Sequence, residues 1–132
     1  MKIADYRPIG DREQRALREM LAVEFRDHQR LAEQICGLAL RQRDEMLFDL
    51  APLSGRATDP RPKTFAVPIE CTYHDEDGAI VYVDLFVDEH DALIELEVWK
   101  PDGSAVLIYF ADADLSVRVA DTDKRKKVPG SN

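Results

Sequence analysis

The run Ile94-Glu95-Leu96-Glu97-Val98-Trp99-Lys100-Pro101-Asp102-Gly103 lies within the most regular part of the chain, residues 65–110. Apolar and polar residues alternate in it, which is typical of a strand with one buried face, and Pro-Asp-Gly is a strong turn signal. Similar apolar runs at residues 65–73, 79–87 and 105–110 predict three more strands. The four runs and their short connections therefore predict a four-stranded antiparallel meander.

The turns of this meander predict which side chains lie opposite one another, because a one-residue shift turns a whole strand over. A three-residue turn ending in Gly78 pairs Cys71 with Val83, since glycine accepts the left-handed backbone there. By the same reasoning Val98 pairs with Val106 across the Pro-Asp-Gly turn. The aliphatic face predicted in this way, which helices must cover, includes Val81, Val83, Leu85, Val87, Ile94, Leu96 and Val98.

Two helices are expected before the sheet. Asp11 is a suitable cap for the first, and Asp27 for the second, after a break at residues 22–26 that contains β-favouring residues. The second helix is expected to run to about Cys36 and to stop at Gly37. One continuous helix is the alternative, because apolar residues keep helical spacing through the break.

Residues 38–50 predict a short leading hairpin. With Arg43-Asp44-Glu45 as its turn, Leu40 lies opposite Phe48 and the apolar sides of both strands agree. Residues 52–63, rich in proline, serine and glycine, are expected to form a surface loop.

Composition limits the classes of function. The chain has 132 residues, which fits one domain over residues 1–120, and a flexible basic tail is expected over residues 121–132. A net charge of −8 argues against nucleic acid and against anionic membranes as partners. Cys36 and Cys71 fall in segments predicted to be buried, which suits free thiols in a reducing compartment, so a cytoplasmic location is expected.

The other face of the predicted sheet is unusual because carboxylates crowd among aromatic rings. The register puts Asp84 opposite Glu70 on one side, and opposite Glu95 or Glu97 on the other. Like charges that face each other on a sheet are unfavourable, so something must offset them. The residues expected on this face include Glu70, Tyr82, Asp84, Phe86, Glu95, Glu97, Trp99 and Tyr109.

Four interpretations of this face remain open. It is a solvated surface, with arginines of the first hairpin lying over it; or it binds a basic protein; or its carboxylates serve a metal or a hydrolase; or it is buried in a homodimer. No catalytic residue, metal ligand set or cofactor is predicted, because no nucleotide-binding, hydrolase or metal motif is present. The polar run at residues 74–78 lacks the spacing of a calcium loop and predicts a hairpin tip.

Three segments carry a resemblance to a family. Tyr6-Arg7-Pro8-Ile9, Val83-Asp84-Leu85-Phe86-Val87-Asp88 and Leu93-Ile94-Glu95-Leu96-Glu97-Val98 with Asp102-Gly103 resemble a group of small bacterial proteins defined only as a domain of unknown function. The resemblance covers most of residues 5–110. It implies N-terminal helices before an antiparallel sheet, it implies no activity, and some such proteins resemble immunity proteins. Family members carry a glycine in the turn after Phe-Val-Asp, which residues 88–91 lack.

The sequence thus predicts an α+β fold with two N-terminal helices on one face of a mainly antiparallel sheet, a short hairpin plus a four-stranded meander. The predicted function is a non-enzymatic interaction with a basic protein partner, as an immunity or inhibitor protein has. The residues predicted to bind are Tyr82, Asp84, Glu95, Glu97 and Trp99.

Overall fold

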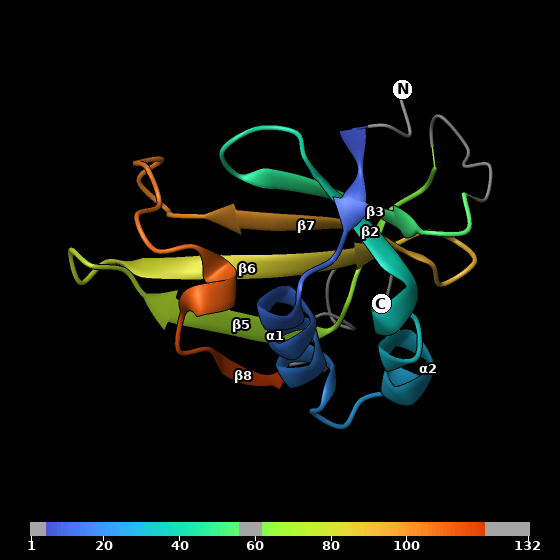
Figure 1. The fold of residues 1–132 in the computed structure, drawn as a ribbon. Helices are drawn as coiled ribbons and strands as arrows, with labels where there is room; N and C mark the ends of the chain where they lie inside the picture. Colours follow the sequence, from blue (N-terminus) through green and yellow to red (C-terminus); the bar gives the residue numbers. More distant parts are fainter. Residues whose placement is uncertain (1–4, 56–61, 121–132) are drawn as a thin grey trace.

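Two N-terminal helices pack against one face of a curved antiparallel sheet (Figure 1), which confirms the predicted α+β fold. The structure, a computed structural model, describes residues 5–55 and 62–120. The elements are β1 (Arg7–Pro8), α1 (Asp11–Leu21), α2 (His28–Ala32), η2 (Ile35–Gly37), β2 (Leu38–Gln42), β3 (Leu47–Pro52), β4 (Phe65–Ala66), β5 (Ile69–His74), β6 (Ile80–Val87), β7 (Leu93–Trp99), η3 (Phe110–Asp112) and β8 (Ser116–Val119).

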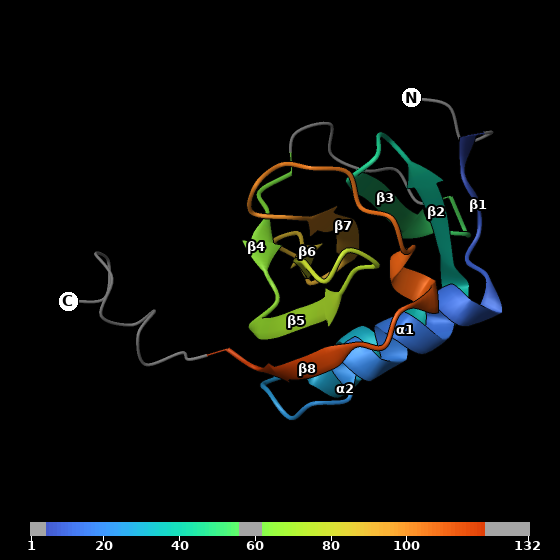
Figure 2. The same ribbon diagram turned by 90° about the vertical axis from the view of Figure 1, so that its left-hand side faces the viewer.

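The strands follow the order β1-β2-β3-β7-β6-β5-β8, and β4 pairs with β6. Figure 2 shows β6 and β7 nearly end-on, with α1 and α2 along one side of the curved sheet, between β8 and β2. The apolar side chains of α1 and the inner side chains of the sheet form one core. We call the opposite side of the sheet, which faces away from the helices, the outer face. Among the described residues, no helix is long and apolar enough to cross a membrane.

Helix α1 begins one residue earlier than a cap at Asp11 requires. Its N-cap is Gly10, whose backbone N–H donates to the Glu13 carboxylate at 2.8 Å, while Asp11 is the first helical residue. The predicted break at residues 22–26 is confirmed, and Asp27 is the N-cap of α2, with a left-handed φ of 67°. Helix α2 is shorter than predicted, since it ends at Ala32 and a separate 3₁₀ turn follows.

The leading hairpin is present, but its predicted register is wrong by two residues. Leu40 lies opposite Leu50 rather than Phe48, so the turn is longer than the three residues expected. Because the error is even, Leu40, Phe48 and Leu50 still point into the core. The hairpin joins the meander through β3, where Phe48 lies opposite Leu96.

The centre of the meander follows the prediction. Cys71 lies opposite Val83, Val83 lies opposite Val98, and Gly78 has the expected left-handed φ of 83°. These pairs place the aliphatic side chains of β5, β6 and β7 inside. The register of the turns was therefore readable from sequence over this part of the sheet.

A β-bulge at the end of β6 changes which residue at the start of β7 is buried. The register shifts between Phe86 and Val87, so Leu93 lies opposite Val87 and is buried, whereas Ile94 is only half-buried. The prediction had Ile94 inside and Leu93 outside. The turn before β7 has no glycine, and Asp91 takes the left-handed conformation with a φ of 62°. Aspartate tolerates this conformation better than most residues.

The prediction of a fourth meander strand at residues 105–110 is wrong. This segment crosses the end of the sheet without strand pairing and ends in η3. Asp75 accepts hydrogen bonds from the backbone N–H groups of Leu107 and Ile108, both at 2.8 Å, and Tyr73 donates its hydroxyl to Ile108 O at 2.6 Å. Buried side chains thus satisfy backbone groups that a neighbouring strand would otherwise have satisfied.

Strand β3 takes the place beside β7 that the fourth strand would have filled, and β8 extends the other edge of the meander. β7 pairs with β3 of the hairpin, and β5 pairs with β8, which was not predicted. The basic run expected in the tail, and residues 56–61 of the predicted surface loop, lie outside the described residues.

Candidate functional site

Four of the five predicted binding residues come together on the outer face, at the centre of the sheet. Tyr82 lies opposite Trp99, and Asp84 lies opposite Glu97, in the register of β6 with β7. All four side chains are half-buried. We call these four residues the aromatic–acid cluster.

The two aromatic rings of this cluster are stacked. The ring centroids of Tyr82 and Trp99 are 4.9 Å apart, with an angle of 21° between the planes. Trp99 Nε1 donates a hydrogen bond to Asp84 Oδ2 at 2.7 Å. Because the stack and the hydrogen bond both cross from β7 to β6, they hold the indole in one orientation on the sheet.

The two carboxylates of the cluster lie close enough to repel each other. The pKa of Glu97 is raised above its ordinary value, first by partial burial and then by the negative charges of Asp84 and Glu95. Within residues 5–55 and 62–120, no arginine, lysine or histidine forms an ion pair with Asp84 or Glu97. Negative charge therefore remains at the centre of the outer face.

Glu95, the fifth predicted residue, belongs to a different group. It lies opposite Asp49 of β3, and its Oε2 is 3.8 Å from Arg43 Nη2. The hypothesis that arginines of the first hairpin lie over this face is correct at this point. The structure thus separates Glu95 from the carboxylates of the aromatic–acid cluster.

A second group, which we call the arginine cluster, consists of Tyr6, Arg41, Arg43 and Asp49. The Asp49 carboxylate is buried and accepts from both guanidinium groups, with Arg41 Nε at 3.1 Å and Arg43 Nε at 3.2 Å from its oxygens. The Arg41 guanidinium carbon lies 5.0 Å from the centroid of the Tyr6 ring. Burial alone would raise the pKa of Asp49, but the bonds from Arg43 and Arg41 outweigh it and lower the pKa.

The arginine cluster was missed because of the hairpin register. In the structure Arg41 lies directly opposite Asp49. The predicted register, two residues away, put Leu47 opposite Arg41 and hid this ion pair. The alternation of the sequence does show that Arg41 and Asp49 share the outer face, so a correct turn length was the only information lacking.

Glu70, expected beside Asp84 in the carboxylate group, is paired elsewhere. It lies opposite Arg118 of β8 and forms an ion pair with it. This partner was not foreseen because β8 was not predicted.

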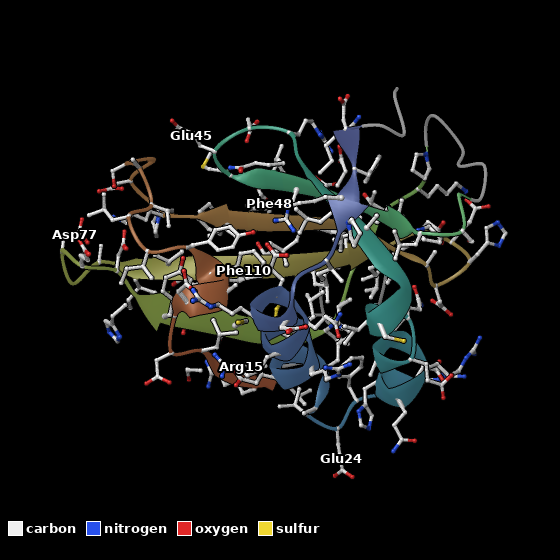
Figure 3. The ribbon with its side chains drawn as sticks, in the orientation of Figure 1. Arg15, Glu24, Glu45, Phe48, Asp77 and Phe110 are labelled. Atoms are coloured by element: carbon white, nitrogen blue, oxygen red, sulfur yellow. The ribbon has the colours of Figure 1, made fainter. Side chains whose placement is uncertain are left out.

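Two buried ionic clusters hold the segment between β7 and β8 in place. Lys100 Nζ lies 2.8 Å from Asp75 Oδ2, and both side chains are almost fully buried. Burial would raise the pKa of Asp75, but hydrogen bonds from Lys100 and from backbone N–H groups lower it to about 2. The Asp75 side chain is thus bound inside the fold, while residues 74–78 form the expected hairpin tip, where Asp77 also contacts Lys100 (Figure 3 labels Asp77).

The second of these clusters joins α1 to the same segment. Arg7 binds the buried Glu13 carboxylate with two hydrogen bonds, at 2.8 and 2.6 Å, and Tyr109 donates its hydroxyl to Glu13 Oε2. The bond from Arg7 is the main reason that the pKa of Glu13 falls to about 2. In the same region the rings of Phe48 and Phe110 meet edge to face at 5.5 Å (Figure 3).

The pockets lie away from the aromatic–acid cluster. Three pockets of about 320, 470 and 400 Å³ open beside the β2–β3 hairpin, beside η2 and at the start of α1, and none is lined by Tyr82, Asp84, Glu97 or Trp99. Cys36 lines the second and is exposed, which corrects the expectation that both cysteines are buried.

The structure also places Cys71 and tests the grouping of possible metal ligands. Cys71 is buried as expected, and burial raises the pKa of its thiol to about 12. In the part of the chain that the structure describes, no three histidine, cysteine, aspartate or glutamate residues are grouped so that they could hold a metal ion.

Comparison with known proteins gives a family without an activity. Residues 6–110 match the family model of a domain of unknown function (DUF6984), and the chain belongs to this family. No curated protein and no solved structure gives a significant match.

Proposed function

We propose that this member of a family of unknown function is a protein-interaction domain, which binds a basic segment of a partner through the aromatic–acid cluster. An inhibitor or immunity protein that masks a basic surface has this kind of role. The proposal joins the charge of the cluster, its aromatic area and its place on the outer face of the sheet, which faces away from the two helices.

The carboxylate pair of Asp84 and Glu97 carries the proposal. Like charges directly opposite on neighbouring strands destabilise a sheet, and no cation of the described residues pairs with either group. A cationic side chain from a partner therefore gains attraction from both carboxylates and removes the repulsion between them. The net charge of −8 also accelerates encounter with a basic protein.

The aromatic pair supports a protein as the partner. Tyrosine and tryptophan contribute large contact areas and are enriched among the residues that dominate binding energies at protein interfaces. Small molecules, in contrast, usually bind in concave pockets, and the three pockets described above lie elsewhere.

Trp99 offers a direct readout, because it is the single tryptophan of the chain. The full chain is titrated with a short peptide of lysine, arginine and glycine, and with a neutral peptide of the same length, while tryptophan emission is recorded. We expect a saturable change with the basic peptide alone, and weaker binding as salt is raised above about 0.15 M.

The matched variants carry equal changes of net charge. Asp84→Asn/Glu97→Gln removes both carboxylates of the cluster, whereas Glu24→Gln/Glu33→Gln removes two exposed carboxylates on the helical side (Figure 3 shows Glu24 pointing away from the sheet). We expect the first variant to bind the peptide at least about tenfold more weakly and the second to keep wild-type affinity. Equal affinity in both variants would show that the peptide senses only overall charge, and the proposal would be wrong.

A further inference from the structure

We infer that the aromatic–acid cluster selects an arginine side chain of the partner over a lysine. This inference rests on the proposed function and names the chemical group that the surface takes. The argument comes from the chain's own arginine cluster, which lies on the same face of the sheet.

The arginine cluster shows how this face accommodates a guanidinium group. Arg41 donates to the Asp49 carboxylate through Nε at 3.1 Å and also through Nη2, so its planar group uses two donors at once. The same guanidinium carbon lies 5.0 Å from the Tyr6 ring centroid. One arginine thus contacts a carboxylate and an aromatic ring together, and its side chain is only 22% exposed.

The aromatic–acid cluster has the same two kinds of contact group. Asp84 uses Oδ2 for Trp99, and no hydrogen bond from the described residues is formed at its Oδ1 or at either oxygen of Glu97. The stacked rings of Tyr82 and Trp99 lie two residue pairs away along the same strands and form the next pair on this face. A carboxylate acceptor and an aromatic surface are therefore adjacent, as they are around Arg41.

Two physical differences favour arginine over lysine in this setting. A guanidinium group is planar and presents several donors in a fixed geometry, so it can bond to a carboxylate with two parallel hydrogen bonds while it stacks on a ring. An ammonium group is compact and strongly hydrated, so it loses more hydration when it leaves water for a half-buried surface. Cation–π contacts in proteins also involve arginine more often than lysine.

The test compares two peptides that differ only in having arginine or lysine at the basic positions. Binding to the full-length chain is followed by calorimetry and by Trp99 emission. We expect the arginine peptide to bind about tenfold more tightly than the lysine peptide. Equal affinities would overturn the inference and leave the proposed function standing. Binding of neither peptide would reject the proposed function and the inference with it.

Variants of the chain test whether the preference for arginine over lysine arises in the aromatic–acid cluster. Glu97→Gln removes the acceptor for a two-bond contact, and Tyr82→Leu removes one ring of the stack, so we expect each to bring the two affinities closer together. Phe86→Leu, on the same face of β6 but outside the cluster, is the control and should leave the ratio unchanged. Circular dichroism confirms that each variant is folded. A ratio that stays the same in Glu97→Gln and in Tyr82→Leu would place the selectivity elsewhere and contradict the inference.

Discussion

The outer face of the sheet has two clusters that use the same kinds of side chain with opposite electrostatic results. In the arginine cluster, Asp49 is buried between Arg41 and Arg43, so its charge is neutralised within the chain. In the aromatic–acid cluster, Asp84 and Glu97 face each other without a cation from the described residues. The difference separates charge that is neutralised within the fold from charge that has no cationic partner among the described residues. Three substitutions test this contrast, and they are given in order of decreasing expected effect.

Asp49→Asn should have the largest effect. The change leaves two guanidinium groups close together without the carboxylate that neutralises them. We expect a loss of about 2–3 kcal/mol in the free energy of unfolding, below the loss for a fully buried pair because Arg43 is half exposed. Urea denaturation measures it. A loss no greater than that of Asp84→Asn would contradict the contrast between the clusters, because Asp84 has no ion pair with the described residues to lose.

Arg41→Lys should have an intermediate effect. Lysine keeps the positive charge beside Asp49 but cannot use two donors and stack on Tyr6 at the same time. We expect a loss of about 1 kcal/mol in the same measurement. Wild-type stability in this variant would show that charge alone is sufficient, and it would also weaken the case for arginine selectivity in the aromatic–acid cluster.

Glu97→Gln should have the smallest effect and the opposite sign. Near pH 7 we expect the free energy of unfolding to rise by about 0.5 kcal/mol, because the repulsion from Asp84 is removed. The pKa of Glu97 is raised in the folded protein, by burial first and by Asp84 next, so the folded state binds this proton more tightly than the unfolded state. Its favourable contribution is present below the ordinary value of 4.5 and is lost as the pH rises through the raised pKa.

The pH dependence provides the check. The gain from Glu97→Gln should therefore appear as the pH rises and vanish at acid pH, in urea denaturation of variant and wild type over a pH series. The pKa of Asp49 is lowered, so the loss from Asp49→Asn should also be largest near neutral pH and should shrink as the pH falls below the ordinary value of 3.8. As the pH rises, the free energy of unfolding relative to wild type should therefore increase for Glu97→Gln and decrease for Asp49→Asn. A change in the same direction for both variants would refute the assignment of opposite roles.

How much could be predicted varies along the chain with the strength of local patterns. The alternation in β6 and β7 predicted that Val83 and Val98 share the buried face, and it left Asp84 opposite either Glu95 or Glu97. The structure has Val83 opposite Val98 and Asp84 opposite Glu97. The bulge after Phe86 was not predictable, because it depends on how the strand end fits the turn that follows. The hairpin register failed for a related reason, since turn length is weakly encoded when no glycine marks the turn.

The segment at residues 105–110 shows a stronger limit on what local sequence can predict. Its alternating apolar residues fit a strand, and its sequence alone favours one. Asp75 and Tyr73, more than thirty residues earlier, bind its backbone instead, and Lys100 neutralises the buried Asp75. A carboxylate that accepts two backbone N–H groups is a non-local competitor, and local propensity carries no information about it.

Strand periodicity and turn residues act over a few positions, so the sequence alone predicted the fold class, the buried faces of the central strands and the shared outer face of Tyr82, Asp84, Glu97 and Trp99. Which carboxylates have a cationic neighbour became apparent only when the packing of the elements was known. Asp49, Glu70 and Asp75 are neutralised by residues on other elements, and Glu95 lies near Arg43, through contacts that depend on how distant segments pack. Ion pairs form between residues that are close in space, and the fold brings such residues together from distant parts of the sequence.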